Sequence, residues 1–231
     1  MKVLRRQLEK LKSIERRKYH QLIHKIHKKH RISGRTLLYV KEYGPHTNIS
    51  GTIIKESLKI LLFASLISSL GGLALENMKQ IFFSIIPLVI LLPVLNDMVG
   101  DYGIIVSSRF TTLLHTGKVK GKWYKNNDLK KLFAQIFIIS VITALISSFL
   151  ALFLSAFYNY GLNIGIIFKI FLIAVMDVSI LVSILSLISV FAGLYLYRHG
   201  EDPNNFLIPI TTSIADFGNI LVLAFLVLLF F

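Results

Sequence analysis

The stretch RHGEDPNNFLIPITTSIADFGN, residues 198–219, decides the fold because it passes from polar to membrane-like within a few residues. After a polar opening it enters an apolar segment that continues to Phe231, and Asp216 stands inside that segment. A carboxylate in a membrane helix costs roughly 2.5–3.5 kcal/mol even on lenient insertion scales, so it marks a function by default. In a helix, Thr212, Asp216 and Asn219 share one face. We predict a functional membrane helix; the alternative is a carboxylate that serves packing alone.

The rest of the chain has the composition of a multi-pass membrane protein. Hydrophobic residues make up 54% of the 231 and gather in long blocks, and a helix needs about 20 of them to cross a bilayer. The sequence has no cysteine, which excludes disulfides and thiolate metal sites, and no cleavable signal peptide is recognisable. We predict an all-α membrane protein with five transmembrane helices: Ser57–Leu75, Ile81–Val106 (continuing to about His115), Leu132–Phe157, Ile164–Tyr197 and Phe206–Phe231.

The charges predict the orientation of these helices. Residues 1–50 hold 14 Lys and Arg against 3 acidic residues. Further lysines lie between the second and third spans: Lys118, Lys120, Lys122, Lys125, Lys130 and Lys131. Because basic loops stay on the inner side, we predict a cell-membrane protein with its N-terminus in the cytoplasm and its C-terminus outside.

The sequence divides into a cytoplasmic arm, residues 1–50, and a membrane domain, residues 51–231. From Val3 to about His27 the arm has the pattern of a basic amphipathic helix, which favours binding to anionic lipid of the inner leaflet. Only one aromatic residue, Tyr19, interleaves the basic residues up to Arg31, which disfavours nucleic acid as a partner. His20, His24 and His27 share a face, but the surrounding lysines would repel a metal ion, so a solvated basic face is the preferred interpretation.

The second span contains an unusual polar run, NDMVGDYG, that follows Pro93. A proline inside a helix removes a backbone donor, so we expect a kink or break there. Asp97 and Asp101 lie one turn apart on one face and repel each other unless a cation lies near. A divalent ion would resolve this conflict; a protonated carboxylate, or one paired with Arg109, is the alternative.

Two further acidic residues have less certain roles. Asp177, in the fourth span, could join a cation path, pair with another span or face Lys169. Glu76, expected with Lys79 between the first two spans, could be an interfacial anchor or part of a cation entrance.

The segment EDPNNFLIPITTSIADFGN resembles the last span of MgtE-type magnesium transporters in its Asp-Pro, Pro, Thr-Thr and Asp pattern. PVLNDMVGDYG resembles that family's Pro, Gly-Asn, Gly pattern, and SSRFTTLLHTG resembles the Ser-Arg-x-x-Thr and Leu-His of related eukaryotic solute-carrier magnesium transporters. The resemblance covers Glu56–Phe231. It implies a homodimeric, five-span cation pathway in which Asp216 matches the pore carboxylate that holds hydrated magnesium.

The chain also departs from that family. Only the basic arm precedes the membrane domain, so we expect the family's cytoplasmic magnesium-sensing domains to be absent or supplied by another chain. The Gly-Asn pair becomes Gly100-Asp101, and Asp97 stands where glycine is usual. These added acids would change ion choice or couple transport to protons or sodium.

We therefore expect a channel or secondary transporter for divalent cations, with Mg²⁺ as the transported ion. Mg²⁺ keeps much of its water and binds through few carboxylates, so Asp216 of two copies would hold it and Thr212 would orient its water. Asp97 and Asp101 would form an adjoining acidic site, with Asp177, Asn219 and Glu76 as further candidates. The alternatives are a cation exchanger coupled to Na⁺ or H⁺, and a non-transporting membrane anchor whose basic arm recruits a partner. No nucleotide loop or catalytic triad spacing occurs, so an enzyme is not expected.

Overall fold

The structure is a computed structural model of the chain. It describes residues 49–119, 123–158, 160–198 and 203–231, with the side chains of residues 49–53 and 55–57 left out. The predicted basic arm, with its histidine face, lies outside the described residues, and both remain predictions.

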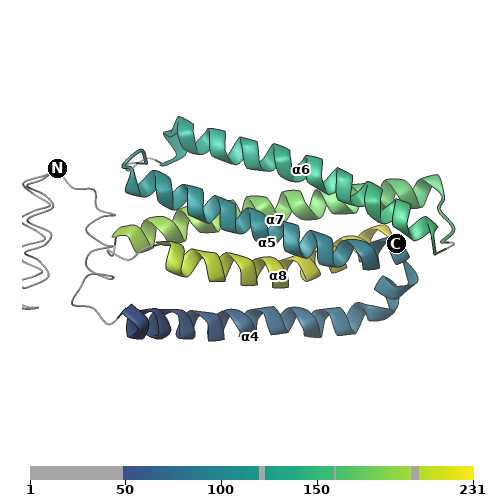
Figure 1. Cartoon of the computed structure of the whole chain (residues 1–231). Helices are drawn as coiled ribbons and strands as arrows, with labels where there is room; N and C mark the ends of the chain where they lie inside the picture. The colour runs from purple at the N-terminus through teal and green to yellow at the C-terminus, as the bar shows by residue number, and fades with distance from the viewer. Residues whose placement is uncertain (1–48, 120–122, 159, 199–202) are drawn as a thin grey trace, which may run out of the picture.

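Five long α-helices and one short 3-10 helix make up the secondary structure of the described residues. Each long helix is long and apolar enough to cross a membrane, which confirms the five predicted spans. In chain order they are α4 (Ile49–Ser84), α5 (Ile86–His115), the 3-10 helix η1 (Trp123–Lys125), α6 (Asn127–Ala156), α7 (Ile164–Arg198) and α8 (Pro203–Phe230) (Figure 1).

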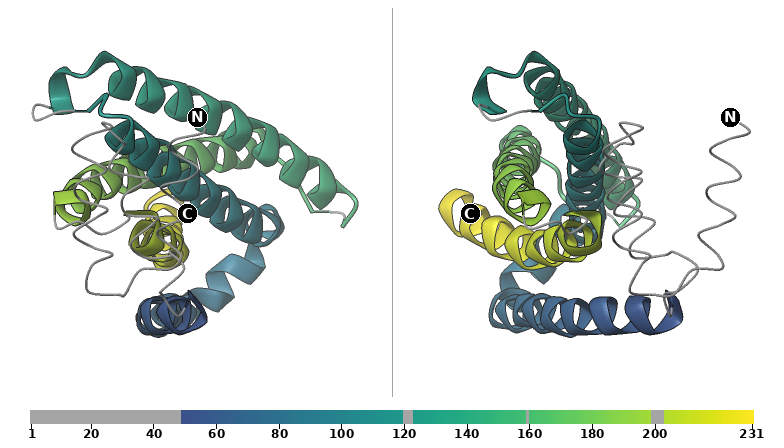
Figure 2. Two further views of the ribbon diagram at one scale, coloured as in Figure 1. Left: turned by 60° about the vertical axis from the view of Figure 1, so that its left-hand side comes forward. Right: turned by 90° about the vertical axis from the view of Figure 1, so that its left-hand side faces the viewer.

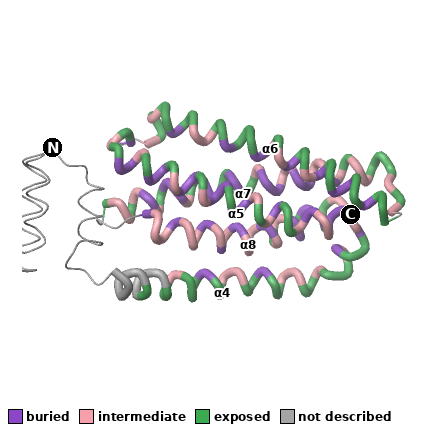
Figure 3. Tube along the Cα trace, in the orientation of Figure 1, coloured by how far each residue is buried: buried purple, intermediate pink, exposed green. Residues whose placement is uncertain are grey.

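The helices form a bundle with α5, α7 and α8 at its centre. These three pack against one another, α6 covers α5 and α7, and α4 packs on α8 at the opposite edge (Figures 1 and 2). Buried residues therefore follow the central helices, whereas α4 and α6 are largely exposed along their length (Figure 3). Apolar side chains on these outer surfaces are what a lipid environment requires.

Small residues allow the central helices to approach closely. A Cβ atom added at Gly103 of α5 would lie 3.2 Å from both Leu185 Cδ1 of α7 and Thr211 Cβ of α8. One turn further along α5, the Ser107 and Ser189 hydroxyls bond at 3.0 Å in the buried interior. Small side chains at such crossings are typical of helices that pack in lipid.

The structure differs from the sequence prediction where the first two spans meet. Glu76 and Lys79 were expected to lie in a connection, but both lie within α4, and the helix ends only at Ser84. The connection is short, and Pro87 occupies the first turn of α5, where its missing N–H costs no helical bond.

Of the kink or break expected at Pro93, the break does not occur, because α5 runs through this residue as one helix. Proline removes a single N–H donor, and a break would expose more unpaired backbone groups where no water can satisfy them. The continuous helix is therefore the cheaper arrangement.

The ends of α5 and α6 near the lysine-rich connection are well capped. Gly117 has a φ of 69°, a left-handed conformation that favours glycine. It lets the backbone N–H groups of Gly117 and Lys118 bond the Leu114 and Leu113 carbonyls at the end of α5. Asn126 then caps α6 by accepting from the Leu129 N–H at 3.0 Å.

Candidate functional site

Asp216 lies where three helices meet and receives a hydrogen bond on each carboxylate oxygen. Ser68 of α4 donates its hydroxyl to Oδ2 at 3.0 Å. Asn96 of α5 donates its side-chain amide to Oδ1 at 2.8 Å. Asp216 itself is only partly buried. Both donors are neutral, so they fix the direction of the carboxylate without cancelling its charge.

Close packing between α4 and α8 brings Ser68 to this position. Gly71, one turn after Ser68, is buried against α8. A Cβ atom there would lie 3.3 Å from Phe217 Cα and 3.5 Å from the Asp216 carbonyl oxygen. A small residue at this point lets the two backbones approach, and the Ser68 hydroxyl then reaches the carboxylate.

Asp97 and Asp101 lie on the outer side of α5, where both are exposed. They line a groove along the helix together with apolar residues that include Pro93 and Ile105. Among the described residues, no Lys, Arg or His lies within ion-pair distance of either carboxylate, so the predicted alternative of a pair with Arg109 has no counterpart in this structure. These acids leave a negative face on a membrane-spanning helix.

Thr212 is on the same helix as Asp216 but is not bonded to it. Its hydroxyl donates to the carbonyl oxygens of Ile208 and Pro209, both at 3.0 Å. Such bonds to carbonyls three or four residues back are usual for Thr and Ser inside a helix, and Ser213 makes one to Pro209 as well. The Thr212 oxygen can still accept a hydrogen bond, for example from a bound water.

Asp177 and Asn219 are buried in the centre of the bundle. Both side chains are 0% exposed, and their polar atoms have no hydrogen-bond partner among the described residues. They lie in neighbouring parts of α7 and α8, because Leu181 of α7 contacts α8 at Gly218. Neither joins Asp216, whose hydrogen bonds come from α4 and α5.

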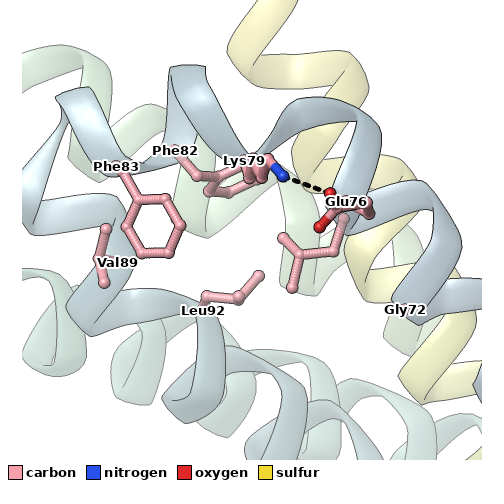
Figure 4. A pocket seen from close by; sticks show the side chains of 8 residues that line it. Gly72, Glu76, Lys79, Phe82, Phe83, Val89 and Leu92 are labelled. Carbon is pink, nitrogen blue, oxygen red and sulfur yellow. Dashed lines mark hydrogen bonds and ion pairs between the residues drawn. The ribbon is translucent and has the colours of Figure 1, made fainter.

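Glu76 lies apart from Asp216, two turns beyond Ser68 on α4. It is exposed and forms an ion pair with Lys79. The pair borders a small cavity between the end of α4 and the start of α5 (Figure 4). Apolar side chains form most of its wall: Leu75, Phe82, Phe83, Val89 and Leu92.

Within the described part of one chain, the acidic residues do not gather into a cluster. No group of three or more Asp, Glu or His residues there has the arrangement of a metal-binding site. A cation at Asp216 would therefore meet one carboxylate, two neutral side chains and water.

Sequence reasoning did not identify Ser68 and Asn96 as site residues. Asn96 stands beside Asp97 in the polar run of the second span, and a polar residue in that run could have been considered as a site residue. Ser68 carries no comparable signal, because Ser65 and Ser69 on the same helix are equally small and polar.

The fold and the polar residues inside it define a multi-pass membrane protein with carboxylates placed within its spans. A family model described as MgtE, divalent cation transporter, matches residues 92–226. The chain belongs to this family, which is one of transporters and not of enzymes, and the resemblance inferred from sequence is confirmed. No curated protein and no solved structure matched the chain.

Proposed function

We propose that this divalent-cation transporter carries Mg²⁺, with the hydrated ion held by Asp216. The observation that carries the proposal is the carboxylate fixed by two neutral donors, Ser68 and Asn96. A Lys or Arg partner would cancel the charge permanently. Neutral donors leave it available to a cation while holding it in one orientation.

Mg²⁺ suits this arrangement better than ions that shed water easily. It demands octahedral oxygen coordination, dehydrates reluctantly and commonly binds through one or two carboxylates with several retained waters. Each carboxylate oxygen of Asp216 accepts one hydrogen bond in the protein and has a further acceptor position for a water of the hydrated ion. Thr212 can accept from another such water.

We propose that the complete path forms between two copies of the chain. Asp97 and Asp101 are exposed on a membrane-spanning helix, without a basic partner among the described residues. Charged groups within spans face a bundle interior or a water-filled cavity, not lipid. A second copy against this side of α5 would enclose both acids beside the cation path, with a two-fold axis relating the two Asp216 residues.

The proposed orientation keeps the N-terminus in the cytoplasm and the C-terminus outside. Four described lysines lie in or near the connection between α5 and α6: Lys118, Lys125, Lys130 and Lys131. The C-terminus lies at the opposite end of the bundle (Figure 1). Under the positive-inside rule, the lysine-rich end is cytoplasmic.

The deciding experiment measures Mg²⁺ uptake into liposomes that contain the full chain, under an inward-negative potential. Asp216→Asn keeps the size of the side chain and removes its charge, so we expect uptake to fall to the level of empty liposomes. The matched control is Glu76→Gln, which removes a charge at a residue that pairs with Lys79, and it should retain most of the uptake.

Uptake by folded Asp216→Asn protein equal to that of the wild type would exclude Asp216 as the ion-holding group and direct attention to Asp97 and Asp101. Wild-type protein that transports Co²⁺ but no Mg²⁺ would contradict the choice of ion.

A second candidate, exchange of Mg²⁺ for Na⁺ or H⁺, is favoured by the buried and unpartnered Asp177. A carboxylate in this position is expensive in a membrane protein, which makes it a candidate site for a coupling ion. If exchange occurs, an opposing Na⁺ or H⁺ gradient should accelerate Mg²⁺ flux in the wild type, and Asp177→Asn should abolish the acceleration. Flux that ignores both gradients would exclude this candidate.

A further inference from the structure

A basic pocket lies between the end of α5 and the start of α6, away from the Asp216 site. Three cations line it, Arg109, Lys118 and Lys131, together with one acid, Asp128. Asp128 Oδ2 lies 3.9 Å from Lys118 Nζ, so these two charges largely offset each other. Arg109 and Lys131 have no carboxylate within ion-pair distance among the described residues. The pocket therefore keeps an uncompensated positive charge.

The hydrogen-bond donors of the pocket suit an anion. The Thr112 and Thr116 hydroxyls, which also line it, are occupied, since they donate to the Ser108 and Thr112 carbonyls. The donors that remain are the Arg109 guanidinium, the Lys118 and Lys131 ammonium groups and the Gln135 amide. A guanidinium presents paired N–H groups that match the oxygens of a phosphate.

The pocket lies at the boundary of the membrane. Arg109 lies in the last two turns of α5, and Thr116 is the residue that caps the end of this helix. Trp123 and Tyr124 follow in η1, and such aromatic residues are typical of the membrane–water interface. The floor of the pocket is apolar, formed by Leu113 and Leu132.

An exposed apolar strip continues from the pocket along α6 into the membrane. Residues seven apart lie on the same side of a helix. The side of α6 that carries Lys131 and Gln135 therefore also carries Ile138, Ile142, Leu145 and Phe149. These positions are exposed and apolar throughout: Ile138 58%, Ile142 50%, Leu145 41% and Phe149 62% exposed. Two turns before Arg109, Tyr102 of α5 bonds Thr143 of α6 at 2.8 Å, so the two helices stay in contact further into the membrane.

We propose that this pocket binds the phosphate headgroup of an anionic phospholipid whose acyl chain lies along the α6 strip. Basic pockets between membrane helices on the cytoplasmic side are sites of this chemistry. A free phosphate would use the cations and the Gln135 amide but would leave the apolar floor and strip without a partner. The combination of both surfaces at one pocket favours a lipid.

The test uses the purified full chain in neutral detergent and counts bound lipids by native mass spectrometry. Phosphatidylglycerol is titrated against phosphatidylcholine with the same acyl chains. The pocket variant is Arg109→Gln with Lys131→Gln, and the matched control is Lys125→Gln with Lys130→Gln, which removes the same charge from exposed lysines that do not line the pocket. The N-terminal arm is unchanged in both, so lipid bound there contributes equally.

We expect the wild type and the control to bind phosphatidylglycerol with affinities within about twofold of each other. The pocket variant should lose about thirtyfold, roughly fivefold for each cation removed. Lys131→Gln alone should lose about fivefold, which keeps the test informative if the double variant does not fold.

Equal losses in the pocket variant and the control would show diffuse surface charge and overturn the proposal. No loss in a folded pocket variant would do the same. Displacement of the lipid by inorganic phosphate at comparable concentration would assign the pocket to free phosphate instead.

Discussion

Asp216 shows how neutral donors can fix a carboxylate between membrane helices, as the proposed ion site requires. Its two oxygens accept from Ser68 and Asn96, which removes the freedom of the carboxylate to rotate. Hydrogen bonds between membrane helices are worth about 0.6–2 kcal/mol. That is enough to orient one side chain but too little to hold α4 in place alone, so the donors act mainly on the carboxylate.

We predict that Ser68→Ala weakens Mg²⁺ binding, because Asp216 Oδ2 then loses its fixed donor. The loss of about 0.6–2 kcal/mol corresponds to a rise of about three- to thirtyfold in the Mg²⁺ concentration for half-maximal uptake. Liposome uptake over a range of Mg²⁺ concentrations measures this value. Ser69→Ala is the control, because the Ser69 hydroxyl donates to the Ser65 carbonyl within α4. Identical curves for the two variants would argue against a role for Ser68.

Asp216 could be identified from sequence because a carboxylate stands out in an apolar run. Its partners could not be identified in this way. Ser65, Ser68 and Ser69 have the same chemistry, and only the packing of α4 on α8 selects Ser68. Thr212 shares a face with Asp216, but its hydroxyl donates to backbone carbonyls of its own helix. Residue spacing does not reveal that these carbonyls compete with Asp216 for the hydroxyl.

α4 depends on α8 for most of its packing, and the two helices approach closely at Gly71. A Cβ atom at Gly71 would lie 3.0 Å from Ile220 Cδ1 and 3.3 Å from Phe217 Cα, whereas one at Gly72 would meet nothing within 4 Å. Two adjacent glycines of one helix therefore have different roles. Gly71 permits the contact, and Gly72 faces open space.

Gly71→Leu should destabilise the protein by about 1–3 kcal/mol, since an inserted side chain must push α4 away from α8. Gly72→Leu should be neutral or stabilising by up to about 1 kcal/mol, because leucine is a better helix former than glycine. Thermal unfolding in detergent compares the two variants. A common transition temperature for both would mean that the contact at Gly71 contributes nothing to stability.

The sequence predicted which helices exist better than where they end. Apolar length identifies a span, but α4 continues through Glu76 and Lys79, two charged residues that pair with each other on its surface. Pro93 suggested a kink or break, and α5 continues through it because one missing N–H is cheaper in a membrane than an open turn. A local sequence pattern does not show the energetic cost of ending a helix, because that cost depends on the surrounding lipid.

In the bundle as a whole, the apolar outer surface of α6 contrasts with the acidic side of α5. Ile142 and Phe149 belong to a surface suited to lipid, whereas Asp97 and Asp101 interrupt the outer side of α5 with charge. The lysines of the sequence predict the orientation of the helices in the membrane, and this orientation stays a prediction. The association of two copies stays a prediction, because a pattern along one chain does not show which surface another chain covers.

We predict that the acidic side of α5 lies at the proposed axis between two copies. The chain has no cysteine, so single cysteines are clean probes. Val94→Cys, in the groove beside Asp97, should yield a dimer with a short bis-maleimide cross-linker in native membranes. Phe149→Cys, exposed on α6, should remain monomeric. The opposite pattern would move the axis to α6 and contradict the proposed path.

The hydrogen bond from Ser68 to Asp216 joins residues 148 positions apart, which has a consequence for biosynthesis. α4 is the first described helix to be made, and its main partner, α8, is the last. At about 5–20 residues per second, α4 must wait on the order of ten seconds in the membrane before α8 emerges. The carboxylate of Asp216 and its Ser68 donor can therefore come together only after α8 has been made.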